Sequence, residues 1–179
     1  MVGALKYNHL MGGFISLDVC PINYGDKRLH LYRKMITCFK SVPTHGFTKR
    51  EEVVELLRPK LPELSNLEMG FLVNNFVPDI DKKIGGKHWK WSINNDAIFN
   101  HLEHIQAFDY KETYSGKCAF IGASNSDYCN TNNEKHMASI RKYFPNASIQ
   151  MIDGATHMLH IEKPLETTQA IVNALEHMP

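Results

Sequence analysis

The stretch DGATHMLHIEKP, residues 153–164, says more about the fold of this chain than any other segment. It follows SIQMI at residues 148–152, which has the length and apolar content of a buried strand. Pro164 can open a helix, because proline is favoured at the first helical position. A Gly-Ala turn thus places His157 between a strand and the last helix. An imidazole there could exchange protons in acyl transfer, although a structural loop histidine is the simpler alternative.

The segments around this stretch repeat the alternation of strand and helix. Residues 118–121 are predicted to form a strand, followed by a polar loop to about Asn133 and a helix that ends at Phe144. Near the N-terminus, FISLDV at residues 14–19 is nearly all apolar, as is typical of strands in a parallel sheet covered on both faces.

Between these regions, the pattern is mostly helical. Helices are predicted over residues 27–40, from a Thr48–Glu51 capping box to Pro59, from a second box at Ser65–Glu68 to about Phe76, and from Asn94 or Asn95 to His104. Residues 87–93 alternate like a strand, with Gly85-Gly86 as its turn.

The order of elements predicts an α/β fold, in which parallel strands with flanking helices carry a helical insertion. We expect three segments along the chain. Residues 1–26 hold the end of a helix and a core strand, residues 27–110 form the helical insertion, and residues 111–179 form the C-terminal α/β part.

Composition excludes several classes of protein. The chain has 179 residues, 43% of them apolar and 22% charged, with a net charge of +1. This charge predicts neither a basic surface that would bind nucleic acid nor a polybasic membrane anchor. No apolar run reaches the ~20 residues that a transmembrane helix needs. The four cysteines are expected to be free thiols. The histidine pairs 101/104 and 157/160 lack a third ligand at a recognisable spacing, so no metal site is predicted.

Several stretches together carry a resemblance to a known family. The chain resembles the second half of α/β-hydrolase domain-containing protein 11 and its bacterial esterase relatives, within the α/β-hydrolase superfamily. The matching stretches keep the family's order and near-family spacing: residues 4–21, 89–94, 120–126 and 154–164.

The resemblance implies the C-terminal part of an α/β-hydrolase fold, with the helical block as its cap. It also implies serine-dependent hydrolysis of small or lipid esters, His157 as the general base, and no metal or organic cofactor. Trp89 and Trp91 are expected to anchor the cap.

The serine nucleophile is expected to be missing from these residues. NHLMGG at residues 8–13 mimics a nucleophile elbow with Leu10 at the serine position, but an elbow must lead into a full helix, and only residues 14–17 separate Gly13 from Asp18. Residues 1–9 are better explained as the end of the helix that follows an elbow upstream. We therefore expect a fragment without nucleophile or oxyanion hole, inactive alone. The alternative is a non-catalytic truncated product that acts, if at all, by binding protein.

The acid partner of His157 stays open between several residues. The resemblance puts Ser126 at the acid's usual place, and Asp127 could take the role if the loop shifts by one residue. Asp18 is favoured, because a carboxylate that ends an apolar strand is costly unless it is paired, and some α/β-hydrolases use that position. Asp96, at the start of a cap helix, is a further candidate, although a charge there is common in any helix.

Partners and location are predicted only in outline. A small ester or lipid is the expected substrate, nucleic acid is not expected, and the edge of the strand at residues 14–19 could mediate self-association. An intracellular location, mitochondrial or cytoplasmic, is expected.

Overall fold

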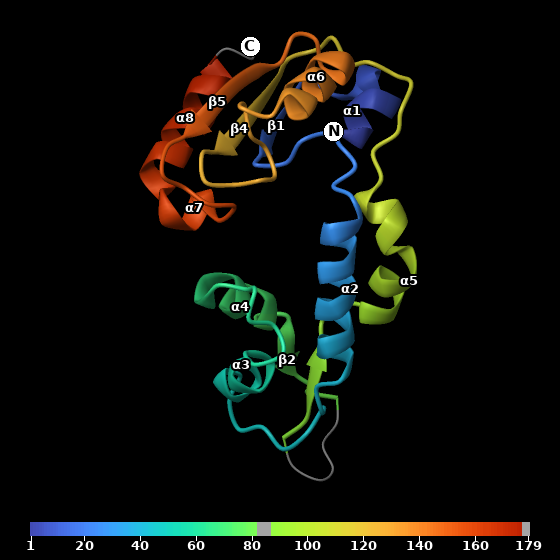
Figure 1. Cartoon of the computed structure of the whole chain (residues 1–179), viewed down its shortest axis with the longest axis vertical. Coiled ribbons are helices and arrows are strands. Elements are labelled where there is room, and N and C mark those ends of the chain that lie inside the picture. The colour runs from blue at the N-terminus through green and yellow to red at the C-terminus, as the bar shows by residue number, and fades with distance from the viewer. Residues whose placement is uncertain (82–86, 177–179) are drawn as a thin grey trace. The chain divides into compact units, whose positions relative to one another are not determined.

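A computed structural model describes residues 1–81 and 87–176 (Figure 1). The chain divides into two compact units, one formed by residues 1–23 with 107–179 and the other by residues 24–106. The boundaries between the units lie at residues 23/24 and 106/107, whereas the boundaries expected from the sequence lie at 26/27 and 110/111. The predicted Gly85-Gly86 turn lies outside the described residues.

The first unit is built on a parallel sheet of three strands in the order β1-β4-β5. The strands are β1 (Phe14–Leu17), β4 (Cys118–Ala123) and β5 (Ser148–Ile152). Because the strands are parallel, the loops that follow them all leave from the same end of the sheet, where the strands have their carboxyl ends. Asp18, Ser126 and His157 all lie in the segments that follow these strands, so the topology gathers them at this end of the sheet.

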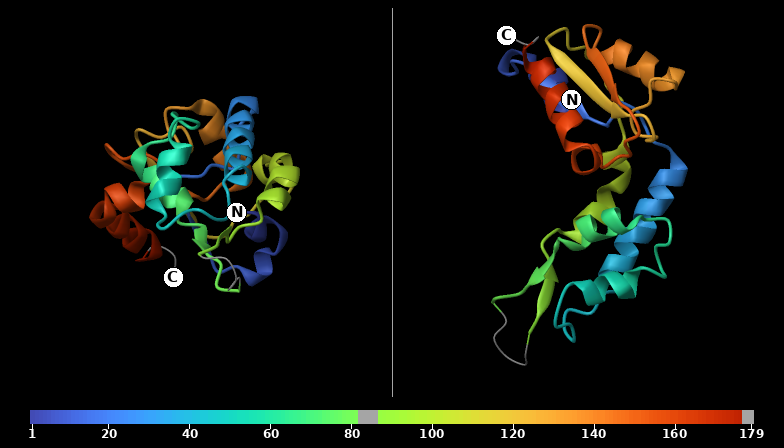
Figure 2. Two further views of the ribbon diagram at one scale, coloured as in Figure 1. Left: turned by 90° about the horizontal axis from the view of Figure 1, so that it is seen from below. Right: turned by 90° about the vertical axis from the view of Figure 1, so that its left-hand side faces the viewer.

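Helices cover both faces of this sheet. They are α1 (Val2–Lys6), α6 (Glu134–Tyr143), the short α7 (Leu159–Glu162) and α8 (Pro164–Glu176), with a 3-10 turn at Asn8–Leu10. Figure 2 shows α6 and α8 on opposite sides of the sheet. One face packs Phe120 against Phe144 and the helix α1, and the other packs Ile121 and Ile152 against α8.

The sequence located these strands well, with two differences. β1 ends at Leu17, because Asp18 adopts a left-handed backbone conformation with φ 50° that a strand cannot continue. β4 continues to Ala123, where it still pairs with Ile152 of β5.

The second unit contains the helices α2 (Asp26–Lys40), α3 (Glu51–Leu57), α4 (Asn66–Val73) and α5 (Asn95–Gln106), and an antiparallel pair, β2 (Phe76–Pro78) and β3 (Trp89–Trp91). Trp89 is stacked on Phe76 with ring centroids 5.4 Å apart. The indole nitrogens of Trp89 and Trp91 donate to the carbonyls of Phe47 and Phe39. Both tryptophans therefore hold this unit together.

Helix ends in this unit confirm some predictions and correct others. The capping box of Ser65 and Glu68 is present, and Asn94 caps α5 by accepting from the Ala97 N–H. The helix after Ser65 ends at Val73 rather than Phe76, because Phe76 begins a strand and stacks on Trp89. The predicted box between Thr48 and Glu51 is wrong, since Thr48 bonds to the carboxylate of Glu52 instead.

The loop that carries His157 is closed by a clasp between Thr156 and Glu162. The backbone N–H and the hydroxyl of Thr156 each donate to a different carboxylate oxygen of Glu162, both at 2.7 Å. These two bonds, the backbone one foremost, hold the pKa of Glu162 below its usual range. The clasp therefore ties the start of the histidine loop to the end of α7.

No helix in the described part of the chain is long and apolar enough to cross a membrane. All four cysteines are free thiols, as expected.

Gly122 in β4 is predicted to tolerate no side chain. A Cβ there would lie 2.5 Å from the Cys129 carbonyl oxygen, a backbone atom of the next loop that cannot rotate away. Gly122→Ala should lower the free energy of unfolding by about 1–3 kcal/mol, measured by urea denaturation. Gly3→Ala is the matched control, because a Cβ at helical Gly3 meets nothing within 4 Å and should be neutral or slightly stabilising. Equal stability of the two variants would contradict the predicted clash.

The clasp should open in acid. Since the folded-state pKa of Glu162 is lowered, its contribution to stability is present above the unfolded-state pKa and lost as the pH falls through the folded-state value. The Thr156 amide resonance should therefore shift at a midpoint below the usual range of glutamate. Glu162→Gln should abolish that titration, whereas Glu166→Gln, an exposed change in α8, should not. A titration that survives Glu162→Gln would show that another group causes it.

Candidate active site

Asp18 is the centre of the candidate site. Its N–H donates to the Ile121 carbonyl at 2.7 Å, which continues the β1–β4 ladder by one residue, and its positive φ then turns the chain out of the strand. Aspartate tolerates this left-handed conformation better than most residues do. The side chain is fully buried, with 0% of its surface exposed.

The buried carboxylate of Asp18 is satisfied by three hydrogen bonds. Its Oδ1 accepts from the Ala123 N–H at 3.1 Å, and its Oδ2 accepts from the Ser126 hydroxyl at 2.5 Å and from Nδ1 of His157 at 2.8 Å. Burial of an ionised carboxylate is tolerated only with such partners. The donors come from the end of β4, the loop after β4 and the loop after β5, so Asp18 joins all three segments.

The loop that carries His157 leaves β5 through a tight turn at Gly154, whose φ of 68° favours glycine. Two contacts fix the turn against the loop after β4. The Ser124 hydroxyl accepts from the Gly154 N–H at 2.8 Å, and the Asn125 N–H donates to the Ala155 carbonyl at 2.9 Å. His157 is therefore carried on a loop anchored on both sides, by these bonds and by the Thr156–Glu162 clasp.

The imidazole of His157 has distinct roles for its two nitrogens. Because an ionised carboxylate only accepts, Nδ1 carries the hydrogen in the bond to Asp18. This tautomer leaves Nε2 with a free electron pair, which can take a proton. The His157 side chain is 35% exposed, whereas Asp18 is fully enclosed. Chemically, this arrangement is the one that the base and the acid of a catalytic triad require.

Ser126 bridges Asp18 and the chain that follows. Its hydroxyl donates to Asp18 and accepts from the Tyr128 N–H at 3.1 Å. It therefore adds a hydrogen bond to the network but no charge. The structure brings Ser126, Asp18 and His157 together in one hydrogen-bonded cluster.

The other candidate acids lie elsewhere. Asp127 is exposed at the surface of the loop after β4. Asp96 belongs to the second unit, where its carboxylate pairs with the Lys40 ammonium at 2.5 Å in the first turn of α5. Of the carboxylates considered from sequence, Asp18 is the one hydrogen-bonded to His157.

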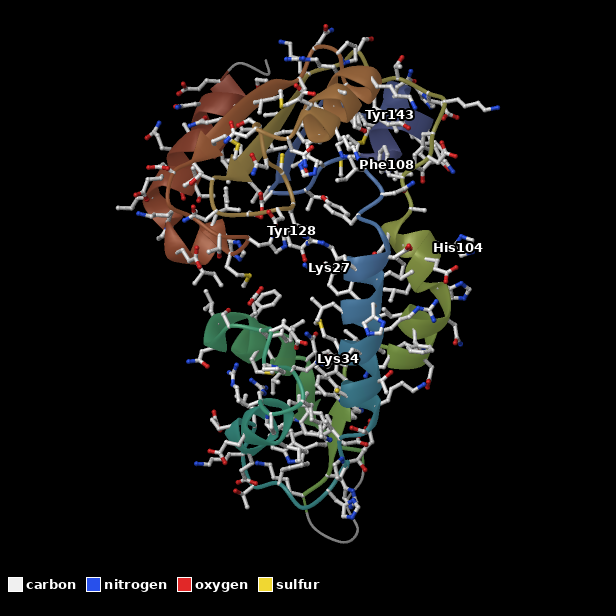
Figure 3. The ribbon with its side chains drawn as sticks, viewed as in Figure 1. Lys27, Lys34, His104, Phe108, Tyr128 and Tyr143 are labelled. Carbon is white, nitrogen blue, oxygen red and sulfur yellow. The ribbon has the colours of Figure 1, made fainter. Side chains whose placement is uncertain are left out.

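The sequence did not reveal two members of this cluster, the Tyr128 side chain and the Ala123 backbone N–H. Tyr128, labelled in Figure 3, has its ring stacked on that of His157 with centroids 3.7 Å apart and an interplanar angle of 17°. The only available signal was its place two residues after Ser126. Ala123 gave none, because its contribution is a backbone N–H.

Metal ligation and the Cys118 thiol are separate features from the histidine network. Within residues 1–81 and 87–176, no group of three or more His, Cys, Asp or Glu side chains could hold a metal ion. Burial raises the pKa of the Cys118 thiol to about 11, which keeps it protonated and a poor nucleophile.

Comparison with curated proteins finds hydrolases. The chain is 29% identical over 181 residues to the sn-1-specific diacylglycerol lipase ABHD11 of Danio rerio, a match that covers 98% of this chain and 53% of that protein. It is 34% identical to the Mus musculus protein of the same name over 106 residues, 59% of this chain and 32% of that one. Esterase YbfF of Escherichia coli is 23% identical over 88% of this chain and 55% of its own length. The chain thus spans about half the length of the relatives that it matches most fully.

Solved structures agree on the fold, and no family model matches the sequence. An esterase from a marine microorganism has a TM-score of 0.76 at 24% identity, over 89% of this chain and 59% of its own. E-2-(acetamidomethylene)succinate hydrolase has a TM-score of 0.65 at 16% identity, over 97% of this chain and 60% of its own. At these identities the likeness shows the fold. Together with the curated relatives, it shows that the chain belongs to the α/β-hydrolase superfamily.

Proposed function

We propose that this chain supplies the general base and the acid of a serine-dependent ester hydrolase, acting on small or lipid esters. The observation that carries the proposal is the 2.8 Å hydrogen bond from His157 Nδ1 to the buried carboxylate of Asp18. A hydrogen bond to a fully buried, otherwise satisfied carboxylate sets both the tautomer and the direction of an imidazole, which a loop histidine of structural role does not need.

In the proposed reaction, Nε2 of His157 takes the proton of a serine hydroxyl as the serine oxygen attacks the acyl carbon. The imidazolium then gives this proton to the departing alkoxide, which leaves as an alcohol. A water molecule attacks the acyl-enzyme in the same way and releases the carboxylic acid and the serine. Asp18 stays ionised throughout and stabilises the imidazolium that forms in each half. Ser126 and the Ala123 N–H hold the carboxylate in place.

We propose that the serine and the oxyanion hole lie outside these 179 residues. The elbow-like residues 8–13 support this: Asn8–Leu10 is a single 3-10 turn, and β1 begins at Phe14, so no helix follows Gly13. Leu10, at the serine position of the motif, is 73% exposed and carries no hydroxyl. The printed names of the relatives, a diacylglycerol lipase and an esterase, support an ester as substrate.

Hydrolysis should appear when the missing half is supplied. We would fuse the part of the zebrafish relative that precedes its match to this chain in front of Met1, and measure hydrolysis of 4-nitrophenyl butyrate. The fusion should hydrolyse the ester, and His157→Ala or Asp18→Asn should lower kcat/KM by about 100-fold or more. The 179-residue chain alone should give no hydrolysis above buffer.

His160→Ala is the matched control, because His160 is an exposed histidine on α7, three residues from His157, and should leave hydrolysis unchanged. Folding of the fusion would be judged by near-UV circular dichroism. A folded fusion that does not hydrolyse the ester would contradict the proposal and favour a non-catalytic, protein-binding chain. Turnover by the 179-residue chain that depends on His157 would instead place a nucleophile within it.

We also propose that the open edge of β1 mediates self-association. In the described part of the chain, β1 pairs only with β4, so its other side presents unpaired backbone groups. The N–H groups of Phe14 and Asp18 point to β4, and by the alternation of a parallel ladder those of Ile15 and Leu17 point to the open side.

Self-association should depend on the backbone of Ile15. Sedimentation of the 179-residue chain should give about twice the monomer mass of 20.5 kDa. Ile15→Pro should produce a monomer, because proline removes an outward N–H without touching the bonds to β4. Ile15→Val keeps that N–H and should remain a dimer. A wild-type chain that sediments as a monomer at all concentrations would contradict this proposal.

A further inference from the structure

We propose that Tyr128 is a positioning residue, which holds the plane of the His157 imidazole so that Nε2 points toward the reacting atoms. The inference rests on the proposed function of His157 and adds to it a residue outside the triad. Tyr128 does not itself touch substrate in this proposal; it acts through His157.

The geometry is that of a stacked pair. The two ring centroids lie 3.7 Å apart and the planes differ by 17°, so the phenol ring covers one face of the imidazole. Near-parallel rings at this distance are in van der Waals contact across the whole ring area. Both side chains are half-buried, which leaves room for the imidazole to move if the phenol ring is removed.

The hydrogen bond to Asp18 orients this imidazole but leaves its ring plane some rotational freedom. The side chain is held at Cβ and at Nδ1, but small changes of its two torsion angles that keep the bond to Asp18 still allow a limited rotation of the ring that moves Nε2. A flat surface against the ring face removes that rotation. One bonded atom and one covered face together determine the direction of Nε2, which proton transfer requires.

Tyr128 is connected to the same network a second time, through its backbone. Its N–H donates to the Ser126 hydroxyl, which donates to Asp18, which accepts from His157, on which the Tyr128 ring stacks. The contacts thus form a closed circuit. A displacement of the imidazole would have to move the phenol ring or break one of these bonds.

The loop that carries Tyr128 is anchored directly after this residue. The next residue, Cys129, is 1% exposed in the core of the first unit, and its carbonyl approaches Gly122 of β4 closely. The following N–H, of Asn130, donates to Nδ1 of His136, a buried residue on α6. The stacking surface is therefore fixed to the sheet and to a helix.

The test is nuclear magnetic resonance of the 179-residue chain, which needs no nucleophile or substrate. With histidine labelled by ¹⁵N, the His157 resonances are assigned by their loss in His157→Ala. In the wild type, the carbon-bound ring protons of His157 should be displaced upfield by the phenol ring current. Its Nδ1–H should be visible as a protected downfield resonance.

Tyr128→Leu should remove the upfield displacement and speed solvent exchange of the Nδ1–H by roughly two- to tenfold. Tyr128→Phe keeps the ring and should preserve both signals, a rescue that a general loss of packing would not give. Tyr7→Leu replaces an exposed tyrosine of the same unit and should change neither.

The inference is overturned if the exchange rate of the Nδ1–H is unchanged in a folded Tyr128→Leu chain, or if Tyr128→Phe behaves like Tyr128→Leu. If Tyr128→Leu does not fold, the wild-type spectrum still decides, because His157 ring protons without upfield displacement would exclude the stack.

Kinetics of the fused esterase separate the two proposals. Tyr128→Leu should lower kcat by about two- to tenfold with KM unchanged. If the fusion is folded but inactive while the resonances behave as expected, the proposed function fails and the positioning of His157 by Tyr128 stands. If the fusion is active and Tyr128→Leu leaves kcat unchanged, the positioning role fails and the proposed function stands.

Discussion

The buried carboxylate of Asp18 is the constraint on which the rest of the site depends. A charged group with no exposed surface is tolerated only where donors replace the water it has lost, and three donors converge on it. Loss of any one donor would leave part of a buried charge unsatisfied. The segments that supply the donors are therefore held in one arrangement by the same requirement, and His157 is one of those donors.

Sheet geometry explains why the acid can reach across the site. Neighbouring strands lie about 4.8 Å apart, so β1 and β5, which are separated by β4, are about 10 Å apart. The left-handed turn at Asp18 ends β1 at the end of the sheet from which the loops leave. The Asp18 carboxylate accepts a hydrogen bond there from His157, in the loop after β5. β4 lies between β1 and β5 in strand order, and the N–H of its last residue, Ala123, and the Ser126 hydroxyl in the loop after it donate to the carboxylate.

Local patterns in the sequence predicted the elements of the sheet and the histidine loop. Apolar segments, Pro164 and the Gly-Ala turn are signals that act over a few residues, and the strands and α8 lie close to where these signals placed them. The pairing of Asp18 with His157 joins residues 139 positions apart, so spacing could only suggest it, through the cost of an unpaired buried carboxylate. The short strand β2 and the stack of Tyr128 on His157 depend on tertiary contacts with Trp89 and with the histidine loop. No local pattern could predict those contacts.

The identities of residues 18 and 126 are coupled by the same electrostatics. The resemblance to other α/β-hydrolases predicts an acid at position 126, in the loop after β4, where this chain has serine. With a carboxylate already at position 18, a second one at 126 would bring two like charges to the 2.5 Å contact that Ser126 now makes. A hydroxyl instead donates to the first carboxylate and accepts from the Tyr128 N–H. Serine at 126 is therefore the complement of aspartate at 18. A carboxylate at 126 would repel the charge of Asp18, whereas the serine hydroxyl donates a hydrogen bond to it.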